Sequence, residues 1–273
     1  MESDGLPSMH TSRRRFLAVM PTVLFAACTS SGRGRSAAGT TAPGPITAPA
    51  RPATTAPSVP TSVPTSVRSP AGGAARFIRQ GPGSPPVIAF TFHGNGDVGL
   101  LDQLLAVAAA HHAPITIFAV GRWLDDNPGV AQHVLGAGHE LANHTYTHPS
   151  LGRLGPAEVA SEITKARDSL VRHAGSPGKW FRPSGVEVPG ATILDAAGAA
   201  GYGTVVGYDV DPHDYQDPGA AAVRSRTAAG AHAGAIVSLH TGHRGTVDAL
   251  SGILDDAAAK GLRPVTVSEL LQA

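Results

Sequence analysis

From Pro85 to the end of the chain, short apolar runs alternate with longer, Ala-rich stretches in which apolar residues recur at helical spacing. The short runs predict β-strands at 87–92, 115–120, 140–144, 179–182, 204–210, 235–240 and 263–267. The longer stretches predict helices at 100–112, 130–137, 156–173, 191–200, 220–231 and 247–260. A short turn at 268–272 follows, with Ser268 as its expected N-cap.

Strands that alternate with helices predict parallel pairing through right-handed crossovers, which is the α/β class. Seven strand–helix units over about 190 residues favour a distorted seven-stranded β/α barrel, and an open doubly wound sheet is the alternative. In a β/α barrel the functional side chains gather at the carboxyl ends of the strands. The pattern therefore predicts that reactive residues lie just after the predicted strands.

Residues 1–28 have the pattern of an export signal. The stretch SRRRFL at 12–17 precedes an apolar run that is too short to span a bilayer, and it resembles a twin-arginine signal. An ordinary secretory signal with a chance arginine pair is the alternative. Both interpretations place the rest of the protein outside the cytoplasm.

Cys28 directly follows two alanines at the end of that apolar run. This arrangement resembles a bacterial lipobox, in which the cysteine is lipidated after the signal is cleaved. We expect a lipoprotein on the outer face of the cytoplasmic membrane, or a secreted protein if Cys28 is not lipidated. Acyl chains would anchor the protein by about 0.8 kcal/mol per buried CH₂ group.

Residues 29–75 are rich in Pro, Thr, Ser and Ala and contain no aromatic or acidic residue. Such a segment has too little apolar surface to offset the entropy of ordering, so we predict a disordered linker. Its frequent prolines favour extended conformations, which suit a spacer. The predicted domains are thus the export signal 1–28, the linker 29–75 and a catalytic domain at 76–273.

Composition narrows the classes of function. A single cysteine in 273 residues excludes an internal disulfide framework and a cysteine-rich zinc site. A net charge of +1 argues against a nucleic-acid-binding protein. Twelve of the 13 histidines lie between His93 and His243. The body of the protein is therefore rich in histidine, a residue that binds metals and transfers protons. We expect the protein to be a monomer.

Ionisable residues follow the first and third predicted strands. His93 and Asp97 follow the first strand, and His144 and His148 follow the third. Histidines four residues apart lie on one side of a helical turn, where both imidazoles can hold one divalent ion. Neutral imidazoles with oxygen ligands suit zinc best, with cobalt or nickel as alternatives.

Later strand ends carry residues suited to proton transfer and to substrate contact. His240 closes a predicted strand and can donate a proton near neutral pH, with Asp214 to orient it. Arg182 can pair with an acidic group or polarise a substrate oxygen, and Tyr215 and Leu239 can form an apolar wall. A metal that activates water, with an acid beside it, suits hydrolysis of an amide or an ester.

These segments resemble the motifs of the polysaccharide deacetylases, carbohydrate esterase family 4, which carry the NodB-homology domain. GHELANHTYTHP at 138–149 resembles the family motif G-H-E-x-x-N-H-[ST]-x-x-H-P. Three later motifs are matched by FRP at 181–183, DPHDY at 211–215 and LH at 239–240. The resemblance covers about residues 85–271 in order, and it implies a distorted seven-stranded β/α barrel.

The resemblance also implies roles for single residues. By it, His144 and His148 are metal ligands, and Arg182 steadies the catalytic base. Asp214 tunes the general acid, which is His240. Tyr215 stands where the family has Trp, so contacts with substrate are expected to differ more than the fold.

The first family motif is altered in this chain. The pattern T-F-D-D-G supplies the base from its first Asp and the third metal ligand from its second, whereas this chain has TFHGNGD at 91–97. We prefer Asp97 as the third ligand with His93 as the base, because this keeps a carboxylate ligand. The reverse assignment gives a three-histidine site with Asp97 as the base. A degenerate, inactive site is the third interpretation.

The sequence thus predicts a metal-dependent hydrolase that removes N-acetyl groups from cell-envelope polysaccharide, either peptidoglycan or a chitin-like polymer of N-acetylglucosamine. A metal-activated water would attack the amide carbonyl, and His240 would protonate the departing amine. The alternative is a catalytically degenerate lipoprotein that binds envelope glycan or metal. A structural tethering module, which would bind no metal, is a third class.

Overall fold

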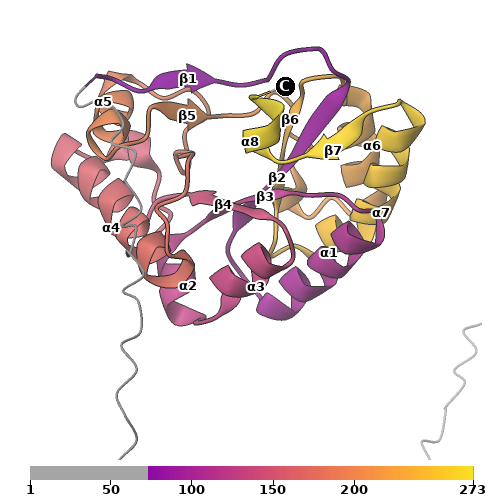
Figure 1. Cartoon of the computed structure of the whole chain (residues 1–273), viewed down its shortest axis with the longest axis horizontal. Helices are drawn as coiled ribbons and strands as arrows, with labels where there is room; N and C mark the ends of the chain where they lie inside the picture. The colour runs from indigo at the N-terminus through magenta and orange to yellow at the C-terminus, as the bar shows by residue number, and fades with distance from the viewer. Residues whose placement is uncertain (1–72, 273) are drawn as a thin grey trace, which may run out of the picture. The chain divides into compact units, whose positions relative to one another are not determined.

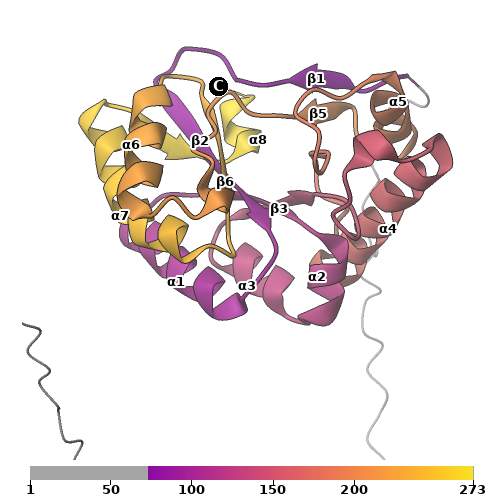
Figure 2. The same cartoon turned by 180° about the vertical axis from the view of Figure 1, so that it is seen from behind.

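A computed structural model describes residues 73–272 of the chain (Figures 1 and 2). The predicted export signal, Cys28 and nearly all of the predicted linker lie outside these residues. Within them, no helix combines the length and the apolar character that crossing a membrane requires. Ala75 is already part of the folded body, because its side chain is buried and its N–H donates to the Leu194 carbonyl over 2.9 Å.

The strand pairs in this part of the chain are parallel. A five-stranded sheet has the order β4-β3-β2-β6, with β7 also pairing with β2, and β1 pairs with β5 in a two-stranded sheet. The strands are β1 (Arg76–Ile78), β2 (Val87–Gly94), β3 (Thr116–Ala119), β4 (Glu140–Asn143), β5 (Thr204–Val206), β6 (Ile236–His240) and β7 (Arg263–Val265). This arrangement confirms the predicted α/β class with a parallel sheet.

Isolated bridges join the two sheets into a ring. Phe181 pairs with Asn143 at the end of β4 on one side and with Val205 of β5 on the other. Val210, which follows β5, pairs with Val237 of β6. Because β6, β2, β3 and β4 are continuous neighbours, these bridges close an irregular barrel.

Helices surround the strands in both views of the molecule (Figures 1 and 2). They are α1 (Val98–Ala110), α2 (Gly121–Asp126), α3 (Val130–Gly136), α4 (Pro156–Ala174), α5 (Ala191–Ala199), α6 (Ala220–Gly230), α7 (Arg244–Ala259) and α8 (Val267–Leu270). Two 3₁₀ turns, η1 (Leu151–Arg153) and η2 (Asp214–Gln216), lie in the connections.

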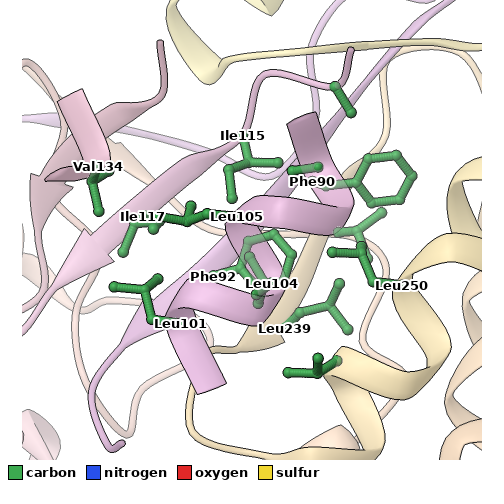
Figure 3. Packing of buried hydrophobic residues seen from close by; sticks show 14 of the residues in the cluster. Phe90, Phe92, Leu101, Leu104, Leu105, Ile115, Ile117, Val134, Leu239 and Leu250 are labelled. Atoms are coloured by element: carbon green, nitrogen blue, oxygen red, sulfur yellow. The ribbon is translucent and has the colours of Figure 1, made fainter. Parts of the chain in front are cut away.

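The alternation of side chains along β2 separates the core from the site. Ile88, Phe90 and Phe92 belong to the large apolar cluster that the helices cover (Figure 3). That cluster also contains Leu101, Leu104, Leu105, Ile115, Ile117, Leu239 and Leu250. The intervening residues, from Val87 to His93, face the other way, because successive side chains of a strand point to opposite faces. His93 is therefore directed into the barrel.

Two predicted strands are shorter than expected. Of 179–182, only Phe181 pairs, since Pro183 has no N–H with which to continue a ladder. The run 204–210 is interrupted after Val206, where the carbonyls of Val206 and Gly207 accept hydrogen bonds from the Arg182 guanidinium instead of from a neighbouring strand.

Other short elements were not predicted or were placed differently. β1 has only three residues and α2 only six, which is too short for a clear periodic pattern. Thr266, not Ser268, caps the last helix, with its side chain accepting from the Glu269 N–H. Ser268 instead donates to the Glu140 carboxylate.

Candidate metal centre

Three histidines meet at the carboxyl ends of β2 and β4. His93 is the last residue but one of β2, and His144 directly follows β4, where its N–H donates to the Ala119 carbonyl over 3.0 Å. Thr145 and His148 have φ angles of 67° and 59°, so the chain between the two later histidines makes a tight turn. The predicted helical turn is thus wrong in its geometry, although the turn still brings both imidazoles together.

His93, His144 and His148 form the group that we call the triad. One ring nitrogen from each lies within 4.8 Å of the other two. The Nε2 atoms of His144 and His148 are 3.1 Å apart, and the ring centroids of His93 and His144 are 4.3 Å apart. His144 is fully buried, His93 is half-buried and His148 is exposed, so the group opens to one side.

Asp97 does not join the triad. Its Oδ1 accepts from the Leu100 N–H over 2.9 Å and caps the amino end of α1. This differs from the preferred expectation that Asp97 is the third ligand. An N-cap carboxylate is held by the first turn of its helix, so its position follows the helix and not the strand ends. The structure brings His93 to the pair instead.

Gly94 cannot carry the carboxylate that the family pattern has there without local movement. A Cβ added at Gly94 would lie 2.6 Å from Cγ2 of Ile117, 3.1 Å from Cα of Ala119 and 3.2 Å from Cζ3 of Trp123. Atoms at such distances must shift. The packing around β3 and α2 is therefore matched to glycine at this position.

The triad imidazoles are held in the neutral form that binds metals. Burial, followed by the proximity of the other histidines, lowers the pKa of His93 and of His144 well below the ordinary value. His144 Nδ1 donates to the Arg182 carbonyl over 2.9 Å, which leaves the Nε2 lone pair free. Three neutral imidazoles that converge in this way fit zinc, cobalt or nickel.

Arg182 lies in the barrel interior, where none of its hydrogen-bond partners among residues 73–272 is acidic. Within the part of the chain that the structure describes, its guanidinium donates to neutral oxygens, namely Thr91 Oγ1 and the carbonyls of Val206 and Gly207, over 2.8–3.0 Å. Burial lowers its pKa to about 9, so it stays protonated at neutral pH. Its side chain stacks on Phe118, 4.0 Å from the ring centroid. These contacts differ from the implied role of steadying a carboxylate base.

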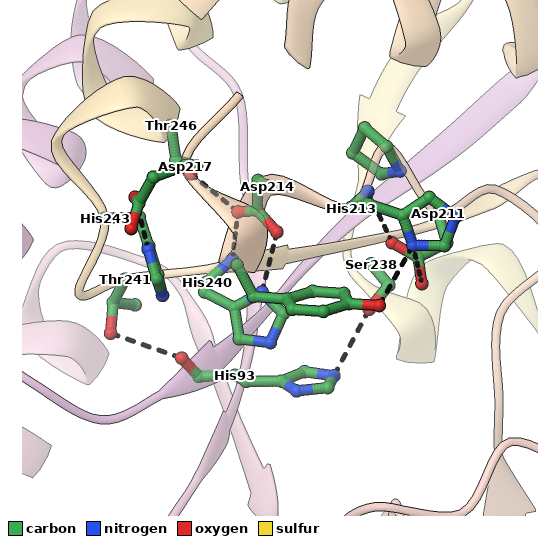
Figure 4. A network of polar contacts seen from close by, with 12 residues as sticks. His93, Asp211, His213, Asp214, Asp217, Ser238, His240, Thr241, His243 and Thr246 are labelled. Carbon is green, nitrogen blue, oxygen red and sulfur yellow. Dashed lines mark hydrogen bonds and ion pairs between the residues drawn. The ribbon is translucent and has the colours of Figure 1, made fainter. Parts of the chain in front are cut away.

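His240 and Asp214 form a pair, which we call the dyad, beside His93 of the triad (Figure 4). His240 Nδ1 lies 2.7 Å from Asp214 Oδ1, and the His240 N–H donates to Asp214 Oδ2 over 2.8 Å. Thr246 Oγ1 donates to the same Oδ2 over 2.6 Å. Burial acts to raise the pKa of Asp214, but these hydrogen bonds outweigh it, and the pKa is lowered.

The triad and the dyad meet at one pocket, which is lined by His93 and His148 of the triad and by His240 of the dyad. Its volume is about 580 Å³, and its lining includes His93, His148, Tyr208, Asp211, Tyr215 and His240. The ring centroids of His93 and His240 are 4.3 Å apart, and those of Tyr215 and His240 are 5.5 Å apart. Tyr215 is 46% exposed, so it offers an aromatic face at the mouth of the pocket.

Leu239 does not reach this pocket. It is fully buried in the helix-covered core, because it alternates along β6 with Ser238 and His240, which line the pocket. The expected apolar wall therefore consists of Tyr215 without Leu239. Sequence reasoning missed Ser238, whose Oγ lies 3.3 Å from His93 Nε2, although a polar residue at an interior position of an apolar strand was an available signal.

Sequence reasoning also missed two threonines. Thr91 bonds Arg182 and stands two residues before His93 on the interior face of β2, so strand alternation could have identified it. Thr246 holds Asp214 from the first turn of α7. No local pattern marks Thr246, since its partner is 32 residues away.

Comparisons with known sequences identify relatives of this chain. The family model for polysaccharide deacetylase matches residues 80–205. The peptidoglycan-N-acetylglucosamine deacetylase of Bacillus cereus is 32% identical over 195 residues, which cover 70% of this chain and 91% of that protein. An uncharacterized protein, YlxY of Bacillus subtilis, is 27% identical over 71% of this chain. The present chain spans only 60% of the length of YlxY.

Solved structures of polysaccharide deacetylases are similar to this chain as well. The Bc1960 peptidoglycan N-acetylglucosamine deacetylase matches with a TM-score of 0.68 and 27% identity over 73% of this chain and 94% of that one. BA3943 of Bacillus anthracis, a family pseudoenzyme, matches with a TM-score of 0.68 and 25% identity over 72% of this chain and 69% of that one. A mutant of BA3943 has restored enzymatic activity. The chain described here belongs to the polysaccharide deacetylase family, carbohydrate esterase family 4.

Proposed function

We propose that this protein is a metal-dependent hydrolase that removes N-acetyl groups from cell-envelope polysaccharide, either peptidoglycan or a chitin-like N-acetylglucosamine polymer. The observation that carries the proposal is the meeting of the triad and the dyad in one open pocket. Metal ligands beside an oriented proton donor are what amide hydrolysis requires. A relative that is 32% identical deacetylates peptidoglycan N-acetylglucosamine by its name, which supports this class of substrate.

His93, His144 and His148 would hold the divalent ion, with zinc as the best fit and cobalt or nickel as alternatives. When bound, such an ion polarises a carbonyl oxygen and lowers the pKa of water. The protein's own part is to keep the three imidazoles neutral and to orient them. The Arg182 carbonyl does this for His144, by accepting from Nδ1.

His240 would protonate the departing amine. Asp214 fixes the orientation of its ring and stabilises the imidazolium form, as a buried carboxylate does for a catalytic histidine. Tyr215 would contact a sugar ring at the mouth of the pocket, and its exposed aromatic face supports this. Asp97 is left with a structural role at the start of α1.

The second candidate function is binding of envelope glycan or metal without catalysis. The replacement of the family's two carboxylates by His93 and Gly94 favours it. The similarity to BA3943, a pseudoenzyme, points in the same direction.

We further propose that the catalytic domain at 76–273 works outside the cytoplasm as a monomer. The twin-arginine pattern of 1–28, the lipobox-like Cys28 and the Pro-rich spacer 29–75 support an exported and lipid-anchored protein. Labelling with a fatty-acid analogue would test the anchor, with Cys28→Ser as the control that should not be labelled.

Acetate release tests the enzymatic proposal. The full chain would be stripped with a chelator, reloaded with zinc, cobalt or nickel, and given N-acetylated chitooligosaccharide or peptidoglycan. We expect metal-dependent acetate release, and none from a fully deacetylated oligosaccharide. Protein that binds the ion tightly but releases no acetate from either polymer would replace the enzymatic proposal by the binding function. Protein that binds no ion would contradict the enzymatic proposal and the metal-binding form of the second candidate, and would leave glycan binding as the function.

A further inference from the structure

The pocket contains few groups that can accept a proton from an attacking water. Its lining includes two carboxylates, Glu187 and Asp211. Glu187 is at the rim, where it accepts from Arg79 over 2.7 Å and is more than half exposed. Asp211 Oδ1 accepts from the His213 N–H over 2.8 Å, and its Oδ2 lies 3.4 Å from His213 Nδ1. Both carboxylates are thus turned to partners outside the triad.

The residue at the family's base position has another task in this chain. His93 belongs to the triad, and an imidazole whose lone pair binds a metal cannot also take a proton. Asp97, the other residue considered for the base, caps α1 and is not part of the pocket lining. The site therefore needs a base from elsewhere, and the remaining histidines of the lining are His240 and His243. The His240 ring contacts that of His93, whereas the His243 ring contacts that of His240, 5.7 Å away between centroids.

His240 has the required free atom in the required place. The ionised Asp214 can only accept hydrogen bonds, so His240 Nδ1 donates to it, and Nε2 is the atom left free. The ring lies 4.3 Å from that of His93 between centroids, and it lines the pocket (Figure 4). Two further hydrogen bonds, from the His240 N–H and from Thr246, hold Asp214 behind it.

We propose that His240 Nε2 carries both proton transfers of the reaction, first as base and then as acid; this inference rests on the proposed deacetylase function. As the water oxygen bonds to the amide carbon, Nε2 takes one water proton, and Asp214 stabilises the imidazolium that forms. When the carbon–nitrogen bond breaks, the same proton passes to the leaving nitrogen. The products are acetic acid, which ionises in solvent, and the free amine, and His240 is neutral again.

The quality of the leaving group separates this proposal from an acid-only role. Cleavage of an amide needs a base for water and an acid for the amine, whereas 4-nitrophenyl acetate expels a stable phenolate and needs only the base. The experiment compares zinc-loaded, full-length wild type with His240→Ala on chitotetraose and on 4-nitrophenyl acetate. Asp211→Asn is the matched variant for the rival carboxylate. Bound zinc and circular dichroism are measured for each protein.

We expect His240→Ala to keep its zinc and its fold and to lose at least about a hundredfold in kcat on both substrates. Added imidazole should restore part of the acetate release from chitotetraose. Asp211→Asn should lose less than about tenfold on either substrate, since water-activating bases contribute more than this.

Ester hydrolysis that survives in His240→Ala while amide hydrolysis is lost would overturn the proposal and leave His240 as the acid only. Loss of ester hydrolysis in Asp211→Asn, with survival in His240→Ala, would assign the base to Asp211. Zinc-loaded wild type that releases no acetate from the sugar would instead overturn the proposed function itself, and the two failures are therefore distinguishable.

Discussion

The triad and the dyad lie in one pocket, but the protein holds them in different ways. The dyad is fixed by short contacts, since the Asp214 carboxylate accepts from the His240 ring, the His240 backbone and Thr246 over 2.6–2.8 Å. In the triad, the Nε2 atoms of His144 and His148 are 3.1 Å apart. Because Nδ1 of neutral His144 carries the proton, its Nε2 is a lone pair that faces either a second lone pair or an N–H of His148. The protein thus fixes the geometry of the dyad by itself, whereas the geometry of the triad would depend more on a bound ion.

The turn between His144 and His148 is held from outside the pocket. Tyr146 OH donates to Asp125 over 3.1 Å, and the backbone N–H groups of Tyr146 and Thr147 donate to Glu162 Oε2 over 2.8–2.9 Å. These contacts place the ligands roughly, and metal binding would then set the final geometry. Mutations on the two sides should therefore separate metal content from proton transfer.

The largest expected effect is that of His144→Ala. This change removes the buried member of the triad, so both bound metal and acetate release should fall below detection. Metal analysis by mass spectrometry and an acetate assay would measure it. His133→Ala, at an exposed histidine that contacts Asp102, is the matched control and should keep both. Retention of stoichiometric metal by His144→Ala would refute the assignment of the triad.

Asp214→Asn should separate the two sides most clearly. The amide cannot stabilise the imidazolium of His240, so kcat should fall by about 10²- to 10⁴-fold. Bound metal should be unchanged, because Asp214 contacts no member of the triad among its hydrogen-bond partners in the described chain. Loss of metal together with activity would show that the dyad and the triad are coupled, and it would contradict their separate roles.

A smaller effect tests which residue completes the metal site. His93→Ala should weaken metal binding, because one of three ligands is removed. Asp97→Ala should keep its metal but lose about 0.5–2 kcal/mol of unfolding free energy, the usual contribution of an N-cap. Metal titration and urea denaturation would measure the two quantities. Weaker metal binding in Asp97→Ala would bring the carboxylate ligand back into consideration.

The smallest expected effect concerns the outer support of the triad turn. Burial acts to raise the pKa of Asp125, but hydrogen bonds from Ser169, Arg172, His173 and Tyr146 outweigh it and lower the pKa to about 2. Because the folded-state pKa lies below the unfolded value of about 3.9, the ionised group stabilises the fold above pH 4.

That stabilisation is lost as the pH falls from about 4 to about 2. Asp125→Asn should therefore be less stable than wild type at pH 7, by less than about 1 kcal/mol at this partly exposed site, and the difference should shrink at low pH. Thermal unfolding of both proteins across this range would measure it. A difference that stays constant with pH would show that the charge of Asp125 contributes nothing.

Local pattern predicted much of the framework. Six of the seven predicted strands, at 87–92, 115–120, 140–144, 204–210, 235–240 and 263–267, contain the observed β2, β3, β4, β5, β6 and β7 at least in part. Apolar runs of this kind form strands because one or both of their faces are buried. The hydrophobic pattern of the sequence shows this burial directly. The segment 179–182 pairs only at Phe181, although Pro183 in the sequence already marked the point at which the ladder had to stop.

The sequence by itself determined the α/β class, the family, and the placement of His144 and His148 after β4 and of His240 at the end of β6. Tertiary structure alone placed His93, and not Asp97, beside His144 and His148. The reason is that strand alternation directs His93 into the barrel, while the first turn of α1 holds Asp97 away from it. It likewise placed Leu239 in the core and left Arg182 among neutral oxygens, because both outcomes depend on side chains brought together from distant strands.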